Sequence, residues 1–301
     1  MEVFIWTEAF NCGEILEPML SSYIKHNSYP IHVFGTENDL HKVSINSDLI
    51  VYEPLSNQKN YFKSVEKKIL SGYRKGHLGT AVLWDHIINS RSETIFIHLD
   101  ADTIFLDDVI SDLVHATKVE GYSIAGSRRP YRNRPYRKNG RDATKLSARP
   151  DCINTDCFAF SKTYISKHPR FWLRRKILGK RVSVSPVVDF FDPVTFEIIR
   201  KGGKIKYMDS PNEGFYSNIN KNSKFINSRI SFAAVGSGCN FHNNGYVGIP
   251  IGYSSFALSS YSLFAREFLN KDIGIPPLED DYIQKKLDKL DKENWKLLNG
   301  F

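Results

Sequence analysis

The chain has 301 residues, of which 41% are hydrophobic and 13% aromatic, and its formal net charge is +8. This composition excludes a disordered or fibrous chain and allows one large α/β domain, or two small ones, with a sizeable core. No apolar run approaches the roughly 18 residues that a membrane-spanning helix needs. The positive charge favours anionic partners such as nucleotides, phosphorylated sugars, lipid head groups or nucleic acid.

The N-terminal third alternates between strand and helix patterns. Apolar runs predict strands at 3–7, 31–34, 49–52 and 94–99, and helical spacing predicts helices at 15–24, 61–70 and 80–89. We expect residues 3–7 to be the first strand and not part of a targeting signal, because Glu2 stands where a signal peptide carries Lys or Arg. The alternation predicts a largely parallel sheet covered by helices. Ligands of such sheets bind beyond the carboxyl ends of the strands.

The rest of the chain is more irregular. It contains helix patterns at 109–114, 191–201 and 279–298 and strand patterns at 122–126, 152–160 and 232–235. The helix at 191–201 has clear ends, with Asp192 as N-cap, Pro193 as first helical residue and Gly202 as the stop. We expect the charged C-terminal helix to dock on its own domain, with a membrane-surface role as the alternative.

The stretch IFIHLDADTIFLDD, residues 95–108, carries an apolar strand directly into Asp100 and Asp102. Residues two apart in an extended segment point the same way, so both acids can aim at one point. Two carboxylates repel unless a cation lies between them, and oxygen ligands suit Mg²⁺ or Mn²⁺ together with substrate phosphates. The alternative is a capping or turn role, which we assign to Asp107 and Asp108 because a helix pattern follows them.

The four cysteines are too few for a disulfide scaffold in a chain of this length. Cys239 and His242 form a CxxH pair that Cys152 and Cys157 could join around zinc, but the spacing matches no zinc pattern. We therefore expect reduced thiols in a cytoplasmic protein, with the inner membrane surface as an alternative location.

The pattern FIHLDADTI resembles the hhhhDxDxT motif of haloacid-dehalogenase-like phosphatases, in which the first Asp is a nucleophile. In that family the motif normally follows the first strand and is completed by a later Lys and by an acidic cluster of DD or GDxxxD form. Here the motif lies a third of the way along the chain, and Asp189 and Asp192 are spaced DxxD. A DxDxT phosphatase is therefore the alternative reading of the motif.

The longer segment TIFIHLDADTIFLDDV resembles the strand and DxD motif of GT-A glycosyltransferases, which follow a nucleotide-binding α/β half. This resemblance implies one GT-A-like α/β domain over 1–301 with a mixed, mostly parallel central sheet. The domain would consist of a Rossmann-like nucleotide-binding half at 1–108, an irregular acceptor half at 109–278 and a C-terminal helix at 279–301. Asp102, with Asp100 beside it, would bind the Mn²⁺ or Mg²⁺ that bridges the diphosphate of a nucleotide sugar.

Later segments resemble glycosyltransferase family eight more loosely. FHNNGYVG resembles the HxxGxxKPW segment of that family, whose His binds the metal, and this implies metal binding by His242. Gly248 replaces the Lys of that segment, so a phosphate-binding lysine must come from elsewhere. CINTDCFAF is placed like the family's strand near the sugar, and VVDFFDP like its acidic segment near the anomeric carbon.

The resemblance and the strand ends together imply a set of site residues. The metal ligands are Asp100, Asp102 and His242, the catalytic candidates are Asp156 and Asp189, and the nucleotide-sugar contacts are Trp6, Thr7, Arg74, Lys75, His77, Asp100, Ala101, Asn154 and Gly245. The implied reaction moves a hexosyl or pentosyl group from a nucleoside diphosphate sugar, UDP-sugar first, to a glycan, lipid-linked or protein acceptor. Peripheral membrane association fits such acceptors. The likeness to family eight favours a retaining enzyme, whereas an inverting enzyme would use Asp156 or Asp189 as the base.

A basic segment, SRRPYRNRPYRKNGRDATKLSAR, runs from residue 127 to 149 and repeats the tetrapeptide RPYR. Its Pro and Gly residues argue against a helix, and we expect a loop at the edge of the sheet that carries the DxD. Such a loop could close on phosphates or on an anionic acceptor. Nucleic acid is the alternative ligand, but no nucleic-acid-binding motif accompanies the segment. We therefore expect no nucleic-acid partner. The chain has no GxxxxGK[ST], which excludes a P-loop.

Overall fold

The computed structural model describes residues 3–9, 13–58, 75–129, 152–165, 195, 198–208, 224–226, 262, 265–266, 270 and 272–274. The strands are β1 (Val3–Ala9), β2 (Ile31–Gly35), β3 (Ile50–Pro54), β4 (Ile95–Leu99), β5 (Ile104–Phe105), β6 (Ile124–Arg129), β7 (Cys152–Ser161), β8 (Ile205–Tyr207) and β9 (Phe225–Ile226). The α-helices are α1 (Gly13–His26), α2 (Glu37–Leu40), α4 (Lys75–Ser90) and α5 (Ile110–Val114). Short helical turns cover Leu55–Gln58, His115–Val119 and Lys162–Tyr164.

Within the described residues, seven strands form one central sheet in the order β3-β2-β1-β4-β7-β6-β8. β3, β2, β1 and β4 are parallel to one another, and β7 is antiparallel to both of its neighbours, β4 and β6. β8 is parallel to β6, so among the described strands β7 alone runs against the common direction of the sheet. The prediction of an α/β fold with a mixed, mostly parallel sheet is therefore confirmed.

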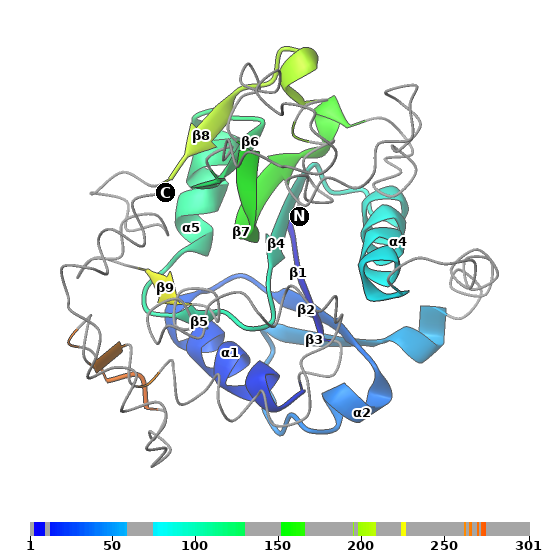
Figure 1. Cartoon of the computed structure of the whole chain (residues 1–301), viewed down its shortest axis with the longest axis vertical. Helices are drawn as coiled ribbons and strands as arrows, with labels where there is room; N and C mark the ends of the chain where they lie inside the picture. Colours follow the sequence, from blue (N-terminus) through cyan, green and yellow to red (C-terminus); the bar gives the residue numbers. More distant parts are fainter. Residues whose placement is uncertain are drawn as a thin grey trace, which may run out of the picture.

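The central strands are buried on both faces, and each face has its own core. Val3, Ile5 and Ala9 of β1 pack with α1 and α5, whereas Phe4 and Trp6 pack with α4. This division follows from the period of two along a strand, which sends successive side chains to opposite faces. Figure 1 shows the resulting layers, with α4 on one side of the central strands and α1 and α5 on the other.

The β6–β7 pair contains an irregularity beside the predicted basic segment. The register of the pair shifts between Gly126 and Arg128. A Cβ atom on Gly126 would lie 2.8 Å from the Cβ of Phe158 and 2.9 Å from a methyl carbon of Ile153. Only glycine lets the two strands approach this closely at the bulge.

Most predicted elements are present, with shifted ends. β1 runs to Ala9 and not to residue 7, and α4 begins at Lys75, five residues before the predicted helix start at 80. Gly202 has a φ of 84°, as expected for a residue that ends a helix. The sequence patterns did not predict α2, β5, β8 or β9, because these elements are too short to show a helical or strand periodicity. The elements predicted at 61–70, 232–235 and 279–298, and the N-cap Asp192, lie outside the described residues.

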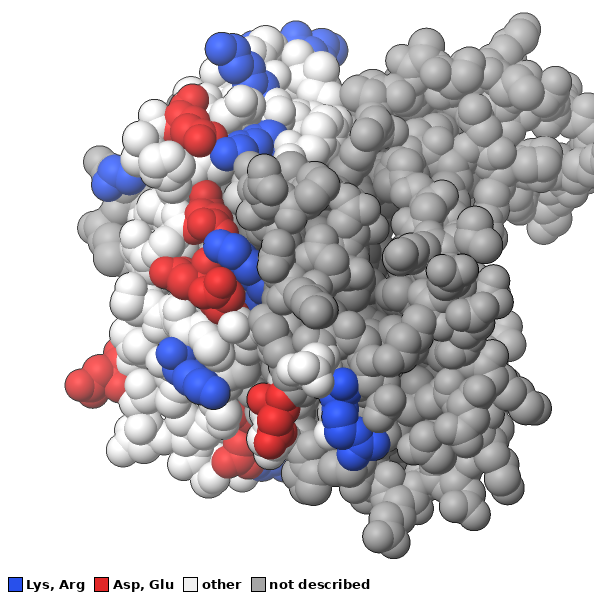
Figure 2. Space-filling model, turned by 90° about the vertical axis from the view of Figure 1, so that its left-hand side faces the viewer, with Lys and Arg blue, Asp and Glu red and all other residues white. Residues whose placement is uncertain are grey.

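Lys and Arg side chains are interspersed with Asp and Glu on the side of the molecule seen in Figure 2, over the described residues. Two ion pairs connect segments far apart in the sequence: Lys206 lies 2.7 Å from Glu120, and Lys224 pairs with Asp112. The described residues on this side therefore do not form a patch of one sign. Within the described residues, no helix is both long enough and apolar enough to cross a bilayer.

Candidate functional site

Asp100 and Asp102 lie where β4 leaves the sheet. β4 runs between β1 and β7, and all five of its residues are buried. The chain then turns, because the N–H of Thr103 donates to the carbonyl of Asp100 at 3.1 Å. Both aspartates are partly exposed after this fully buried strand. The predicted position of the acids at a strand end is confirmed.

The expected conformation of these acids is wrong. We predicted an extended segment in which Asp100 and Asp102 point the same way, but residues 101 and 102 form a turn closed by Thr103. Asp is favoured in turns, and the apolar residues that would prolong the strand stop at Leu99. The two carboxylates are therefore presented from a tight turn, at the edge of the sheet where ligands of parallel sheets bind.

Behind this turn lies a chain of polar contacts that the sequence did not reveal. Oε1 of Glu8 accepts a hydrogen bond from Nε1 of Trp84 at 2.9 Å, and Oε2 of Glu8 lies 3.0 Å from Nε2 of His98. Nδ1 of His98 is 3.9 Å from Oδ1 of Asp100. Three elements, β1, α4 and β4, thus meet beside the DxD. The sequence contained one indication of these contacts: Glu8 and His98 are polar residues within two largely apolar strands.

The register of the strands explains why these residues meet. Trp6 pairs with His98 across β1 and β4, which places Glu8 level with Asp100 at the carboxyl ends of the two strands. On the other side of β4, Leu99 pairs with Cys157 of β7. One residue further along this antiparallel pair, Asp156 comes level with Asp100. The backbone of Asp156 on β7 thus lies beside the end of β4 that leads into the DxD turn.

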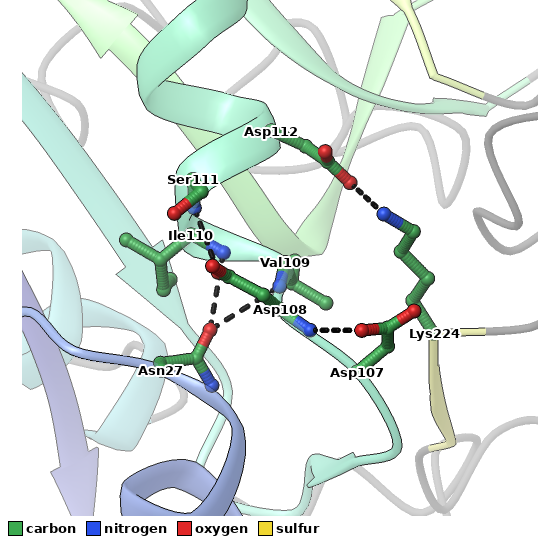
Figure 3. A network of polar contacts seen from close by, with 8 residues as sticks. All are labelled: Asn27, Asp107, Asp108, Val109, Ile110, Ser111, Asp112 and Lys224. Atoms are coloured by element: carbon green, nitrogen blue, oxygen red, sulfur yellow. Dashed lines mark hydrogen bonds and ion pairs between the residues drawn. The ribbon is translucent and has the colours of Figure 1, made fainter.

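Residues that follow the DxD are anchored to distant parts of the chain (Figure 3). Oδ1 of Asn27, just beyond α1, accepts hydrogen bonds from the N–H groups of Val109 and Ile110, both at 3.2 Å. Oδ1 of Asp108 accepts one from the N–H of Ser111 at 2.9 Å, which confirms its predicted capping role at α5. Oδ1 of Asp107 accepts from the N–H of its neighbour Asp108 at 2.8 Å. These contacts fix the segment that leaves the DxD turn.

Two predicted nucleotide contacts lie in the core. The side chains of Trp6 and Thr7 are fully buried, with an exposed fraction of 0%. Trp6 packs edge-on against Trp84 with ring centroids 5.3 Å apart, and β1 continues past it to Ala9. We expected these residues at the strand end because the apolar pattern stops at residue 7. Their burial leaves them no surface for a base or a ribose.

The remaining predicted residues divide into those that the structure describes and those that it does not. Lys75 and His77 belong to the first turn of α4, and Asn154 lies on β7 two residues before Asp156. Ala101 is in the DxD turn. Arg74, Asp189, His242 and Gly245 lie outside the described residues, as does most of the basic segment. Within the described residues, no three His, Cys, Asp or Glu side chains are arranged to hold a metal ion.

A second histidine–glutamate pair lies on the same face of the sheet but away from the DxD. Nδ1 of His32 is 3.1 Å from Oε1 of Glu53, which also accepts from Arg91 at 3.0 Å. Burial lowers the pKa of His32, and the hydrogen bond to Glu53 opposes this shift only in part. Of the residues considered for zinc, Cys157 lies in the core, whereas Cys239 and His242 lie outside the described residues.

Comparison with known proteins gives structural neighbours at low similarity. No protein-family model and no curated protein sequence matches the chain. Among solved structures, an active-site mutant of LgtC aligns with 70% of this chain and 73% of its own, at 11% identity and a TM-score of 0.42. Mouse xyloside xylosyltransferase 1 in its apo form aligns with 53% of this chain and 67% of its own, at 13% identity and a TM-score of 0.35.

A third neighbour is the apo structure of the bifunctional glycosyltransferase WbbM. It aligns with 54% of this chain and 31% of its own, at 11% identity and a TM-score of 0.38. All three TM-scores are below 0.5.

Proposed function

We propose that this protein is a metal-dependent glycosyltransferase that moves a sugar from a nucleoside diphosphate sugar to a hydroxyl acceptor. The observation that carries the proposal is the position of Asp100 and Asp102. They form a partly exposed turn at the carboxyl end of β4, in the middle of a mostly parallel sheet. Ligands of such sheets bind at this edge, and a pair of carboxylates suits a hard divalent cation that also takes phosphate oxygens.

The donor set available at the DxD fits Mn²⁺ or Mg²⁺. Carboxylate oxygens are the ligands that these ions prefer, and both acids keep accessible surface: the side chain of Asp100 is 38% exposed. In this proposal Asp100 and Asp102 hold the metal, and His242 supplies a further ligand from late in the chain. When bound, the metal would neutralise the charge that develops on the leaving diphosphate.

The chain's own residues would position the two substrates. Lys75 and His77 lie in the first turn of α4, where a helix N-terminus favours anions, and they are our candidates for contacts to the diphosphate. Asn154 and Asp156 lie on β7, which runs antiparallel beside β4. They are candidates for contacts to the transferred sugar, together with Asp189. A retaining reaction is favoured, and in an inverting one Asp156 or Asp189 would take the proton of the acceptor hydroxyl.

The donor and acceptor classes follow from this assignment. We propose UDP-sugars as the first donors to examine and a glycan, a lipid-linked sugar or a protein as the acceptor. The basic segment at 127–149, nine of whose residues are Lys or Arg, would contact phosphates of the donor or of an anionic acceptor. A lipid-linked acceptor would bring the protein to a membrane surface.

The decisive experiment is incubation with a panel of UDP-, GDP-, ADP- and CDP-sugars in the presence of Mn²⁺, with release of the nucleoside diphosphate as the readout. No acceptor is needed, because slow transfer of the sugar to water also releases the nucleoside diphosphate. We expect release from one class of donor and loss of this release in EDTA. A phosphatase of the DxDxT type would instead hydrolyse p-nitrophenyl phosphate and leave the nucleotide sugars intact. Three strands precede β4 in the chain, which disfavours that reading because its motif follows the first strand.

A further inference from the structure

We propose that Glu8 and His98 are positioning residues that hold the carboxylate of Asp100 in place for metal binding. This inference rests on the proposed function, because it assigns a role toward the same metal site. The side chain of His98 is 1% exposed and that of Glu8 is 10% exposed, whereas Asp100 is 38% exposed. A buried pair directly behind a more accessible carboxylate is the arrangement by which neighbouring groups orient a metal ligand.

The orientation of the His98 ring is fixed by its partner. Glu8 uses both of its oxygens, since Oε1 accepts from Trp84 at 2.9 Å and Oε2 lies 3.0 Å from Nε2 of His98. A carboxylate oxygen accepts, so this bond is formed by the tautomer in which Nε2 of His98 carries the hydrogen. Rotation of the ring would break a hydrogen bond in a buried place, which is costly.

Aromatic packing holds the same ring from its sides. The ring centroid of His98 lies 4.2 Å from that of Trp84, 5.2 Å from that of Trp6 and 5.7 Å from that of Phe158. These neighbours come from α4, β1 and β7, so the ring is packed by three elements. Such packing leaves a side chain few alternative rotamers.

The fixed ring places Nδ1 at 3.9 Å from Oδ1 of Asp100. This distance is longer than a hydrogen bond. The fixed ring would therefore restrict the orientations of the Asp100 carboxylate by its volume and its polarity, without a direct hydrogen bond. The contact involves Oδ1 of the Asp100 carboxylate, and the side chain of Asp100 remains partly exposed to solvent. Trp84, Glu8, His98 and Asp100 thus form one sequence of contacts from helix α4 to the DxD turn.

A purely structural role for His98 would be to satisfy Glu8 in the core. The two roles differ in what a substitution changes. If His98 only satisfies Glu8, a replacement that keeps a donor at the same place leaves metal affinity unchanged. If His98 positions Asp100, the same replacement weakens metal binding in a protein that is still folded.

The test is the substitution His98→Gln. Its amide nitrogen can occupy the place of Nε2 and still donate to Glu8, while the ring and Nδ1 are removed. The measurements are the Kd of Mn²⁺ in the presence of UDP, by isothermal titration calorimetry, and the melting temperature of the same preparation. We expect Mn²⁺ to bind roughly 10- to 100-fold more weakly than to the parent, as for loss of other groups that orient metal ligands.

His32→Gln is the matched control. It removes a histidine from the same face of the sheet that also contacts a glutamate, Glu53, but that lies on β2, two strands away from the DxD strand β4. We expect its Mn²⁺ affinity to equal that of the parent. Glu8→Gln is the second variant, which loosens the ring by removing the charged acceptor and should weaken Mn²⁺ binding in the same direction even if His98→Gln does not fold.

The outcomes separate this inference from the proposed function. If the parent binds Mn²⁺ with UDP and the folded His98→Gln and Glu8→Gln variants bind it equally well, the positioning role is refuted and the glycosyltransferase proposal stands. An equal loss of affinity in His32→Gln also refutes it, because the effect is then not local to the DxD. If the parent shows no Mn²⁺-dependent binding of any nucleoside diphosphate, the proposed function fails and this inference fails with it.

Discussion

Trp84 and Glu8 are 76 residues apart in the sequence, and the indole N–H of Trp84 donates to Oε1 of Glu8 at 2.9 Å. The contact joins α4 to the carboxyl end of β1, next to the turn that carries Asp100. Trp6 packs against Trp84 and is equally buried, yet its indole Nε1 has no hydrogen-bond partner among the described residues. The two tryptophans therefore differ in whether the indole N–H donates a hydrogen bond, and the effect of this bond on stability can be measured.

Trp84→Phe should destabilise the protein more than Trp6→Phe. Both substitutions shrink a fully buried ring, but only the first removes a hydrogen bond to a carboxylate, which is worth roughly 1–3 kcal/mol. Urea denaturation followed by circular dichroism gives the free energy of unfolding of each variant. Equal losses in the two variants would show that the Trp84–Glu8 bond contributes nothing beyond ring packing.

Asn27→Ala should cost about 1–2 kcal/mol of the free energy of unfolding, the usual cost of losing a helix cap. The substitution removes the acceptor of the buried N–H groups of Val109 and Ile110, which have no water to replace it. Chemical denaturation measures the loss. Asn89→Ala is the control: Asn89 is exposed, and its side chain donates within α4 to the carbonyl of Asp85. A similar loss in both variants would contradict the capping role of Asn27.

The stability of the protein should fall as the pH drops from about 7.5 toward 5, and His32 should cause part of this fall. Burial lowers the pKa of His32 in the folded protein, so below the usual histidine pKa of about 6.5 the unfolded chain binds a proton that the folded chain binds only at lower pH. This contribution is complete above the unfolded pKa and is lost as the pH falls through both pKa values. Arg91 also lowers the pKa of His32, whereas Glu53 and Glu93 raise it.

His32→Gln should therefore show a flatter dependence of melting temperature on pH over this range than the parent. The difference between the two curves isolates His32 from the carboxylates, which also titrate in acid. His115→Gln removes a histidine whose side chain is 58% exposed and serves as the control. Parallel curves for His32→Gln and the parent would mean that His32 does not contribute.

Asp102→Ala should abolish Mn²⁺-dependent binding of UDP and leave the fold intact. The partly exposed side chain is the metal ligand that we consider most direct, and its loss should change the free energy of unfolding by about 1 kcal/mol or less. Calorimetry and a thermal melt measure the two quantities. Asp107→Asn, at an exposed acid five residues further along, should bind Mn²⁺ as the parent does. Retained affinity in Asp102→Ala would exclude the DxD as the metal site.

Local patterns were sufficient for much of the fold. The apolar runs that became β1, β2, β3, β4 and β7 are long enough to show strand character, and the face formed by Ala81, Trp84, Ile87 and Ile88 predicted α4. The change from apolar residues to acids at Asp100 predicted where β4 ends, and the helix pattern after Asp108 predicted its cap. These features depend on residues a few positions apart, which the sequence shows directly.

The tertiary structure decided what depends on register between distant segments. A strand pattern does not say which strand lies beside it, so the antiparallel position of β7 next to β4 and the short pair of β5 with β9 were not predictable. The same holds for Glu8 and His98, which meet because Trp6 pairs with His98 across two parallel strands. Trp6 was assigned to the ligand edge because the apolar pattern stops one residue later, whereas the helix packed over β1 buries it in the core. The sequence by itself determined that two acids follow a buried strand, and only the packing of β1 and α4 decided which side chains lie behind them.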